Sequence, residues 1–206
     1  MTGREIKKVV IIGPESTGKS TLCQNLAEHY QTSWCPEYAR EFLLKHGMNY
    51  TYDDLLTIAM EQIGLEEKYE EEVRKTGRPK DRKYFSDEST VASGLADYPP
   101  FRLFFIDTNM YVMKVWCEFV FGKCHPFILD EIKKRKYDLY LLCDVDLPWV
   151  KDELREYPDL EKRQKLYSIY KDIMVNQTVA WEEISGNYQE RLQKAVSAVD
   201  HLLKSD

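Results

Sequence analysis

Apolar residues follow two patterns that alternate along the chain. Short apolar runs, often β-branched, predict buried strands, and apolar residues three or four positions apart predict helices with one buried face. The predicted strands cover residues 8–12, 32–35, 103–107, 138–145 and 179–184. The predicted helices cover about residues 21–30, 36–41 (a helix start), 53–75, 112–120, 149–174 and 192–203. Strands that alternate with helices indicate an α/β fold, with a five-stranded parallel sheet flanked by helices.

One stretch, from Thr76 to Pro100, follows neither pattern. It is polar, begins with several Lys and Arg residues, and is interrupted by glycines and prolines. Such a length without periodicity is unusual within a compact domain and indicates either a functional flap or a disordered insertion. We expect a flexible insertion at residues 76–100. Residues 1–206 as a whole are expected to form one domain with a sizeable core.

A glycine-rich motif lies where the first predicted strand meets the first predicted helix. Residues 13–20 read Gly-Pro-Glu-Ser-Thr-Gly-Lys-Ser and match the pattern G-x-x-x-x-G-K-[ST]. Glycines let the backbone form a tight loop whose N–H groups point inward, and the helix N-terminus that follows attracts negative charge. The motif therefore predicts a P-loop NTPase fold that binds ATP. The predicted phosphate-binding residues are Gly13, Glu15, Ser16, Thr17, Gly18, Lys19, Ser20 and Thr21.

Specific side chains in and near this loop predict the type of reaction. Lys19 is expected to act on the β- and γ-phosphates, and the Ser20 hydroxyl to bind Mg²⁺. Asp107 ends a strand expected to lie beside the loop, where its carboxylate can hold Mg²⁺ or accept a proton. Hydrolytic P-loop ATPases commonly continue with a glutamate that activates water, but here Thr108 and Asn109 follow. This difference, with the absence of an N-K-x-D stretch for guanine, favours an ATP-dependent kinase.

Charged residues begin the second predicted helix. Glu37, Arg40 and Glu41 are spaced i, i+3 and i+4, so they share one helix face. That face follows a strand beside the loop, where open α/β sheets bind ligands. A solvated face with internal ion pairs explains the spacing equally well.

The charge-dense segment 149–174 follows the fourth predicted strand. Small-molecule kinases carry at this place a helical lid that closes over ATP. Arg155 and Arg163 in this segment are expected to neutralise charge that develops on the transferred phosphoryl group. A solvated surface helix is the alternative for the individual lysines of the segment.

Composition limits the partners. The net charge is −6, which gives no general electrostatic affinity for nucleic acid. No apolar run is long enough to span a membrane, and the first residues lack the apolar core of a signal peptide. We therefore expect a cytoplasmic protein with a small-molecule substrate and without nucleic-acid or membrane partners. The five scattered cysteines are expected to be reduced thiols and not metal ligands.

Several segments together resemble the ribosylnicotinamide kinase domain of NadR-type proteins. They are residues 13–21, 36–42, 105–109 and 122–126, and the likeness continues through residues 149–155. The loop by itself is generic. The elements Glu-Tyr-x-Arg-Glu at 37–41 and Gly-Lys-x-His-Pro at 122–126 make the resemblance specific.

The resemblance implies transfer of the γ-phosphate of ATP to the 5′-hydroxyl of nicotinamide riboside, which yields nicotinamide mononucleotide for NAD synthesis. It places Asp107 beside the attacking hydroxyl and Glu37, Tyr38 and Arg40 around the riboside. Tyr38 is expected to stack on the cationic pyridinium ring. Asn109 is grouped with the substrate-binding residues, and the family often has an aspartate there, a change that could alter substrate or metal binding.

The resemblance covers one activity of a multidomain family. Its larger members carry an adenylyltransferase domain, and some a DNA-binding helix-turn-helix, ahead of the kinase. Only 12 residues precede Gly13, so we expect neither function from this chain alone. Two other hypotheses stay open: a kinase for another nucleoside or small alcohol, and an ATP-binding regulatory module whose segment 149–174 is recognised by a protein partner.

Overall fold

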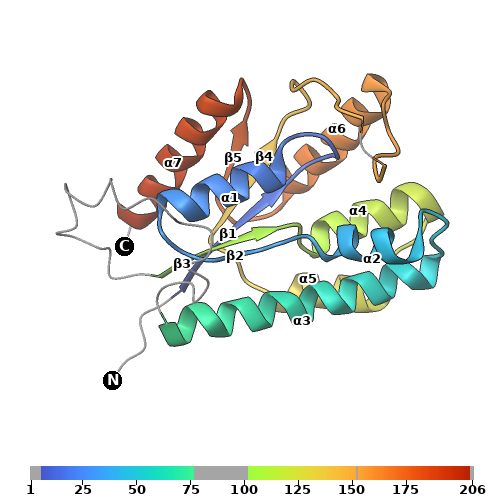
Figure 1. Ribbon diagram of the computed structural model, residues 1–206, viewed down its shortest axis with the longest axis horizontal. Helices are drawn as coiled ribbons and strands as arrows, with labels where there is room; N and C mark the ends of the chain where they lie inside the picture. Colours follow the sequence, from blue (N-terminus) through green and yellow to red (C-terminus); the bar gives the residue numbers. More distant parts are fainter. Residues whose placement is uncertain (1–5, 77–101, 152, 205–206) are drawn as a thin grey trace.

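Parallel strands form the centre of the fold, and helices cover both faces (Figure 1). A computed structural model describes residues 6–76, 102–151 and 153–204. Within these residues five strands form one sheet in the order β2-β3-β1-β4-β5, and each neighbouring pair is parallel. They are β1 (Ile6–Ile12), β2 (Trp34–Cys35), β3 (Arg102–Asp107), β4 (Leu139–Cys143) and β5 (Trp181–Ile184). The predicted five-stranded parallel sheet is confirmed.

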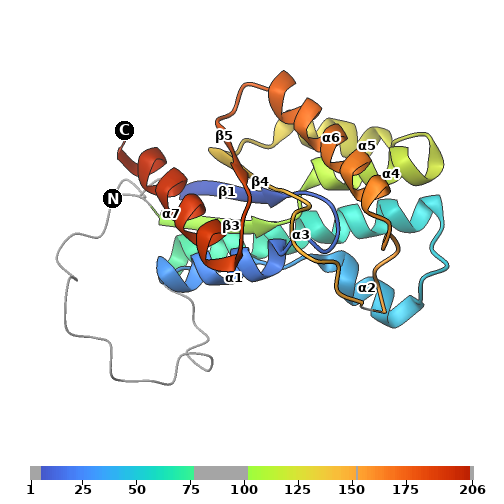
Figure 2. The same cartoon turned by 90° about the horizontal axis from the view of Figure 1, so that it is seen from above.

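Helices connect the strands and form the two outer layers (Figure 2). They are α1 (Lys19–His29), α2 (Tyr38–His46), α3 (Tyr52–Thr76), α4 (Met110–Phe121), α5 (Pro126–Lys134), α6 (Leu160–Asn176) and α7 (Tyr188–Lys204). None of the helices described is long and apolar enough to cross a membrane. Thr76 ends α3, and the rest of the predicted insertion at 76–100 lies outside the described residues.

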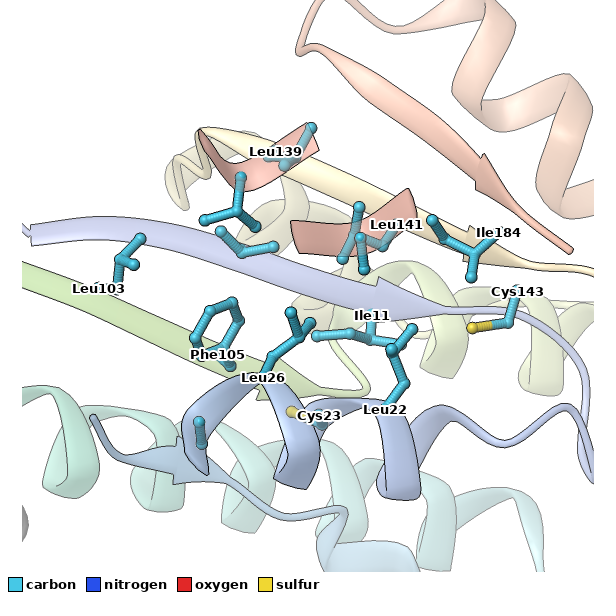
Figure 3. Packing of buried hydrophobic residues seen from close by; sticks show 14 residues of the cluster. Ile11, Leu22, Cys23, Leu26, Leu103, Phe105, Leu139, Leu141, Cys143 and Ile184 are labelled. Carbon is cyan, nitrogen blue, oxygen red and sulfur yellow. The ribbon is translucent and has the colours of Figure 1, made fainter. Parts of the chain in front are cut away.

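Strand residues alternate between the two covered faces, as the period of two in a strand requires. Ile11 and Phe105 pack with Leu26 in a cluster to which α1 and α7 contribute (Figure 3). Their neighbours Ile12 and Phe104 pack in the opposite cluster, with residues from α3, α4 and α6. Because both faces are buried, the strands appear in the sequence as continuous apolar runs.

A third cluster positions the helices beyond the end of the sheet. It joins α2, α3, α4 and α5, and includes Phe42, Leu55, Met113 and Ile128, one from each helix. All four side chains are at most 7% exposed. The cluster therefore fixes α2 relative to α4, and these two helices form walls of the site described below.

The predicted helix over 149–174 is only partly confirmed. The described residues before α6, 149–151 and 153–159, form no helix, and α6 begins at Leu160. Pro158 disfavours a helical conformation in the residue before it. Asp159 is the N-cap, and its side chain accepts a hydrogen bond from the backbone N–H of Lys162 at 2.9 Å. The segment predicted as a helical lid is thus a loop followed by a helix.

One further helix prediction needs correction, and one helix was not predicted. Pro36 was expected in the first turn of the second helix, but α2 begins at Tyr38 with Glu37 as its N-cap. No helix was predicted over α5, which starts at Pro126 with His125 as the N-cap. Proline at the first position of a helix was the available signal, because its fixed φ suits a helix start.

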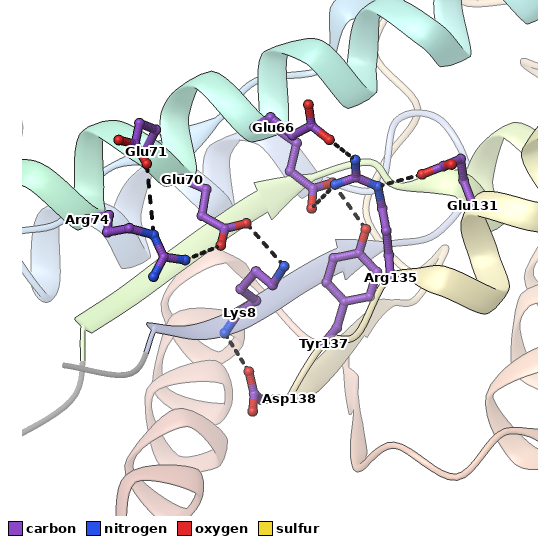
Figure 4. Close-up of polar contacts among 10 residues, drawn as sticks. Lys8, Glu66, Glu70, Glu71, Arg74, Glu131, Arg135, Tyr137 and Asp138 are labelled. Carbon is purple, nitrogen blue, oxygen red and sulfur yellow. Dashed lines mark hydrogen bonds and ion pairs between the residues drawn. The ribbon is translucent and has the colours of Figure 1, made fainter. Parts of the chain in front are cut away.

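A polar network joins α3 to the chain before β4 (Figure 4). The Glu66 carboxylate is fully buried and accepts hydrogen bonds from Arg135 Nη1 at 3.2 Å and from the Tyr137 hydroxyl at 3.1 Å. Arg135 also donates to Glu67 and Glu131. Burial raises the pKa of Glu66, and the Arg135 charge is the largest influence that opposes this shift.

Replacement of Arg135 by methionine should destabilise the fold by about 3–5 kcal/mol, because it leaves a buried carboxylate without its counter-charge. The measurement is the free energy of unfolding from urea denaturation. Lys133→Met is the matched control, since Lys133 and its partner Asp130 are 75% and 57% exposed. An exposed pair contributes at most about 1 kcal/mol. Equal losses in the two variants would contradict the structural role of Arg135.

Candidate active site

The loop between β1 and α1 is closed by hydrogen bonds of its own. Thr17 Oγ1 and Lys19 Nζ both donate to the carbonyl oxygen of Pro14, at 2.8 and 2.9 Å. Gly13 has φ of 140°, and a Cβ there would lie 2.7 Å from the carbonyl oxygen of Cys143. Only glycine fits this position, because both the backbone conformation and the close approach exclude a side chain.

The α1 N-terminus opens on this loop. Gly18 is the N-cap of α1 and has the left-handed conformation, with φ of 76°. The first N–H groups of a helix have no partner within the helix, and the helix dipole makes this end positive. The loop and helix start together form the anion-binding geometry that the motif predicts.

Arg191 of α7 anchors the loop from behind, which sequence analysis did not predict. Its guanidinium is 2% exposed and donates to the carbonyl oxygens of Thr17 and Asp144, both at 3.0 Å. It also forms an ion pair with Asp146. Arg191 lies far along the chain from the loop, so no local pattern could have identified it.

A cavity of about 240 Å³ opens in front of the loop. One end is formed by the loop and the other by α2, α4, α6 and the segment before α6. Its lining residues are Gly13, Pro14, Glu15, Ser16, Thr17, Gly18, Lys19, Ser20, Thr21, Glu37, Ala39, Arg40, Leu43, Val112, Val115, Trp116, Phe119, Leu154, Arg155, Glu156, Tyr157, Leu166 and Tyr170. All eight predicted phosphate-binding residues are among them. A second hollow, between α1 and α7, contains none of the predicted site residues.

Asp107 lies behind the loop at the end of β3, in register with Ile11 of β1. It is 1% exposed, and neither carboxylate oxygen has a hydrogen-bond partner within the described residues. Burial and the nearby Glu37 charge raise the pKa of Asp107 to about 7, although Lys19 and the hydroxyls of Ser20 and Thr108 act in the opposite direction. A buried carboxyl group without a partner is costly unless a ligand or cation completes its interactions.

The residues around Asp107 suit Mg²⁺. This ion prefers oxygen ligands and is usually held by one or two protein groups together with substrate phosphates and water. The Ser20 hydroxyl and the unpartnered Asp107 oxygens are ligands of that kind. The described part of the chain contains no cluster of three or more acidic, histidine or cysteine side chains that could form a complete metal site. A metal here would therefore depend on the nucleotide.

Two of the residues predicted to bind substrate do line the cavity. Glu37 contributes its carboxylate, whose Oε1 accepts a hydrogen bond from Thr108 Oγ1 at 3.4 Å. Arg40, one turn along α2, is exposed and lines the same wall. The face predicted from the i, i+3 spacing therefore includes the side of α2 that lines the cavity.

Tyr38 and Asn109, also predicted to bind substrate, are placed elsewhere. Tyr38 packs against the cluster that joins α2 to α5 and does not line the cavity. Asn109 is 1% exposed and is the N-cap of α4. Its Oδ1 accepts from the Tyr111 backbone N–H at 3.0 Å, and its Nδ2 donates to the Tyr140 hydroxyl at 3.3 Å. The geometry assigns Asn109 a capping role.

Two loop side chains contact the segment that precedes α6. The Glu15 carboxylate accepts hydrogen bonds from the backbone N–H groups of Glu156, at 2.9 Å, and Tyr157. The Ser16 hydroxyl accepts one from the Val150 N–H at 3.3 Å. These side chains were predicted to bind phosphate, but here they tie the loop to the predicted lid.

The two predicted lid arginines differ in their surroundings. Arg155 lines the cavity, and its guanidinium donates to the Val150 carbonyl oxygen. Arg163 is 4% exposed in the first turns of α6, and its Nε and Nη1 atoms have no hydrogen-bond partner within the described residues. It precedes Leu166 and Tyr170, which line the cavity from the same helix. Residues three or four positions apart share a helix face, so Arg163 shares the face of Leu166, but it does not itself line the cavity.

Comparison with known proteins shows which proteins this chain resembles. The trifunctional NAD biosynthesis/regulator protein NadR of Escherichia coli is 24% identical over an alignment of 205 residues, which covers 96% of this chain and 43% of that protein. The chain thus spans less than half the length of this relative. A NadR structure in complex with NR superimposes with a TM-score of 0.72 at 19% identity, over 96% of this chain and 50% of that one. A NadR structure with NAD and AMP-PNP gives 0.63 at 20% identity, over 96% and 49%.

These similarities establish the fold, and a sequence family model defines the membership. The AAA domain model matches residues 8–191, which include strands β2 to β5, all but the first two residues of β1, and the loop between β1 and α1. Arg191, the anchor behind the loop, is the last residue of the match. The chain therefore belongs to the AAA domain family.

Proposed function

We propose that this protein transfers the γ-phosphate of ATP to the 5′-hydroxyl of nicotinamide riboside and forms nicotinamide mononucleotide. One observation carries the proposal: a single cavity joins the phosphate-binding loop to a wall of aromatic and apolar side chains. A polyphosphate fits the first part, and a nucleoside fits the second. Likeness to NadR over 96% of the chain supports the choice of riboside.

The aromatic wall suits the base of this substrate. Its aromatic members are Trp116 and Phe119 of α4, Tyr157 and Tyr170. The nicotinamide ring of the riboside is a pyridinium cation, and cations are attracted to aromatic faces. We infer that these residues take the stacking role expected of Tyr38, since the Tyr38 side chain packs away from the cavity.

The loop and Asp107 supply the chemistry. Lys19 would neutralise charge on the β- and γ-phosphates, and Ser20 and Asp107 would hold Mg²⁺, which lowers the charge of the triphosphate when bound. In the transfer, the 5′-oxygen bonds to the γ-phosphorus as the bond to the β-phosphate oxygen breaks, and ADP leaves. The hydroxyl proton passes to the Asp107 carboxylate if Asp107 serves as the base. Arg155 and Arg163 would neutralise the transferring group from the α6 side.

The test is to incubate the purified protein with ATP, Mg²⁺ and nicotinamide riboside and to measure nicotinamide mononucleotide and ADP by chromatography. We expect equal amounts of the two products, and none after EDTA removes the metal. A panel of other nucleosides runs in parallel. Faster turnover of uridine or thymidine would overturn the choice of substrate, and no turnover of any nucleoside would favour a regulatory ATP-binding role.

A further inference from the structure

A chain of hydrogen bonds ends at an acid in the wall of the cavity. Trp116 Nε1 donates to the Tyr50 hydroxyl oxygen at 2.9 Å, and the Tyr50 hydroxyl donates to Glu156 Oε2 at 2.9 Å. The rings of Tyr50 and Trp116 also meet edge to face, with centroids 5.0 Å apart. Trp116 and Glu156 both line the cavity. Residues from three separate segments thus combine to position one carboxylate.

The donors in this series of hydrogen bonds require Glu156 to accept the hydrogen bond from Tyr50. An indole N–H can only donate, so Tyr50 accepts from Trp116 and has its own proton left for Glu156. Burial raises the pKa of Tyr50 above its ordinary value, which keeps that proton in place. Burial raises the pKa of Glu156, and the hydrogen bond from Tyr50 opposes this shift because it stabilises the ionised carboxylate.

Two acids come together where the phosphate-binding loop meets the segment before α6. Glu15 accepts from the Glu156 backbone N–H at 2.9 Å, and its charge raises the pKa of the Glu156 carboxyl, so the two carboxyl groups are close enough to interact. Neither forms an ion pair with a lysine or arginine of the described chain. Arg155, the neighbouring cation, donates instead to the Val150 carbonyl oxygen. Of the other lining charges, Lys19 belongs to the loop and Glu37 and Arg40 to the α2 wall.

We propose that Glu156, positioned by Tyr50 and Trp116, is a specificity-determining residue that selects ribosides with a cationic base over ribosides whose base also carries a carboxylate. The inference rests on the proposed function. Nicotinamide riboside has a pyridinium ring and a neutral amide, so the Glu156 charge attracts it. Nicotinic acid riboside has the same ring with a carboxylate, which the Glu156 carboxylate repels. Proteins commonly discriminate against a wrong ligand by placing a fixed charge where that ligand carries a charge of the same sign.

The experiment compares kcat/KM for three substrates: nicotinamide riboside, nicotinic acid riboside, and the reduced form of nicotinamide riboside, whose ring is uncharged. The proteins are the wild type, Glu156→Gln and Tyr50→Phe. Glu153→Gln is the matched control, because this acid is exposed on the same segment and does not line the cavity.

We expect the wild type to prefer nicotinamide riboside to nicotinic acid riboside. Glu156→Gln should reduce that preference roughly tenfold, which corresponds to about 1.4 kcal/mol, mainly through KM. The neutral substrate should change little. Tyr50→Phe should move the preference in the same direction by a smaller factor, because the carboxylate stays but loses its fixed position. Glu153→Gln should match the wild type.

The three substrates separate an electrostatic role from a structural one. Equal losses for all three in Glu156→Gln would overturn the proposal, because they would show a general loss of site geometry. An unchanged preference would overturn it too, with the kinase activity left standing. If the wild type phosphorylated none of the three, the proposed function itself would fail, and this inference with it.

Discussion

Lys19→Ala should lower kcat for phosphate transfer by a factor of about 10² to 10³, the usual effect of losing one preorganised group that stabilises transition-state charge. Lys19 Nζ donates to the Pro14 carbonyl oxygen at 2.9 Å, so the ammonium group is already held inside the loop. It therefore needs little reorganisation when a nucleotide binds. The backbone N–H groups and the α1 N-terminus remain in the variant and should still bind ATP, with reduced affinity.

The measurement is the steady-state rate of ADP formation at saturating riboside, together with ATP affinity from calorimetry. Lys45→Ala is the control, since Lys45 is an exposed residue in the last turn of α2. Thermal unfolding of Lys19→Ala should resemble the wild type, because the lost bond joins two residues of the same loop. If Lys19→Ala kept kcat within a few-fold of the wild type, the result would contradict the proposed role of the loop in phosphate transfer.

Asp107→Asn should lower kcat by about 10² to 10⁴, the range expected for a general base. The pKa of Asp107 is raised to about 7. The carboxylate accepts a proton only when ionised, so the wild-type rate should rise with pH and level off above about 7. The Asn variant should lack this rise. Asp130→Asn, an exposed acid of α5, is the control.

The pH profile decides between the two roles of Asp107. If Asp107 is the base, the pH-dependent rise disappears in the variant and the Mg²⁺ requirement changes little. If it is only a metal ligand, the variant keeps a rise with pH and needs more Mg²⁺ for half-maximal rate. A wild-type rate that does not depend on pH between 6 and 8 would contradict the role as base.

The Asp107 carboxyl group should make stability fall as pH rises, whereas it should make the rate rise with pH. An aspartate in the unfolded chain has a pKa of about 3.9, and Asp107 in the folded protein has one of about 7. Between these values the folded state binds one more proton than the unfolded state, so stability contributed by Asp107 falls as pH rises through this window. Asp107→Asn should remove that dependence and leave the protein at least as stable as the wild type at pH 8.

Local sequence patterns were sufficient for the sheet and the loop. A strand such as the one at 8–12 is buried on both faces, so successive positions require apolar side chains. The resulting apolar run makes the strand recognisable from the sequence. Gly13 and Lys19 belong to a continuous motif whose geometry is nearly independent of the rest of the fold. Asp107 ends β3 beside β1, as the sequence predicts, because neighbouring parallel strands end at the same edge of the sheet. Its role in the site stays a prediction.

Orientation of side chains beyond the motif was less predictable. Tyr38 and Glu37 are adjacent, yet one packs toward the cluster that joins α2 to α5 and the other lines the cavity. The spacing of charges cannot give the rotation of α2, which is set by its packing on α3. Asn109 likewise has the chemistry of a substrate ligand, but the start of α4 uses it as a cap.

The sequence by itself determined the α/β order of elements, the phosphate-binding loop and the aspartate beside it, because each is encoded by residues that are neighbours in the chain. The tertiary structure decided the contacts between distant segments. Arg191 reaches the Thr17 carbonyl oxygen from α7, and Trp116, Tyr50 and Glu156 form one chain of hydrogen bonds from three segments. Such contacts depend on how elements pack and not on local periodicity, so only the folded chain brings the acid, the aromatic wall and the loop around one cavity.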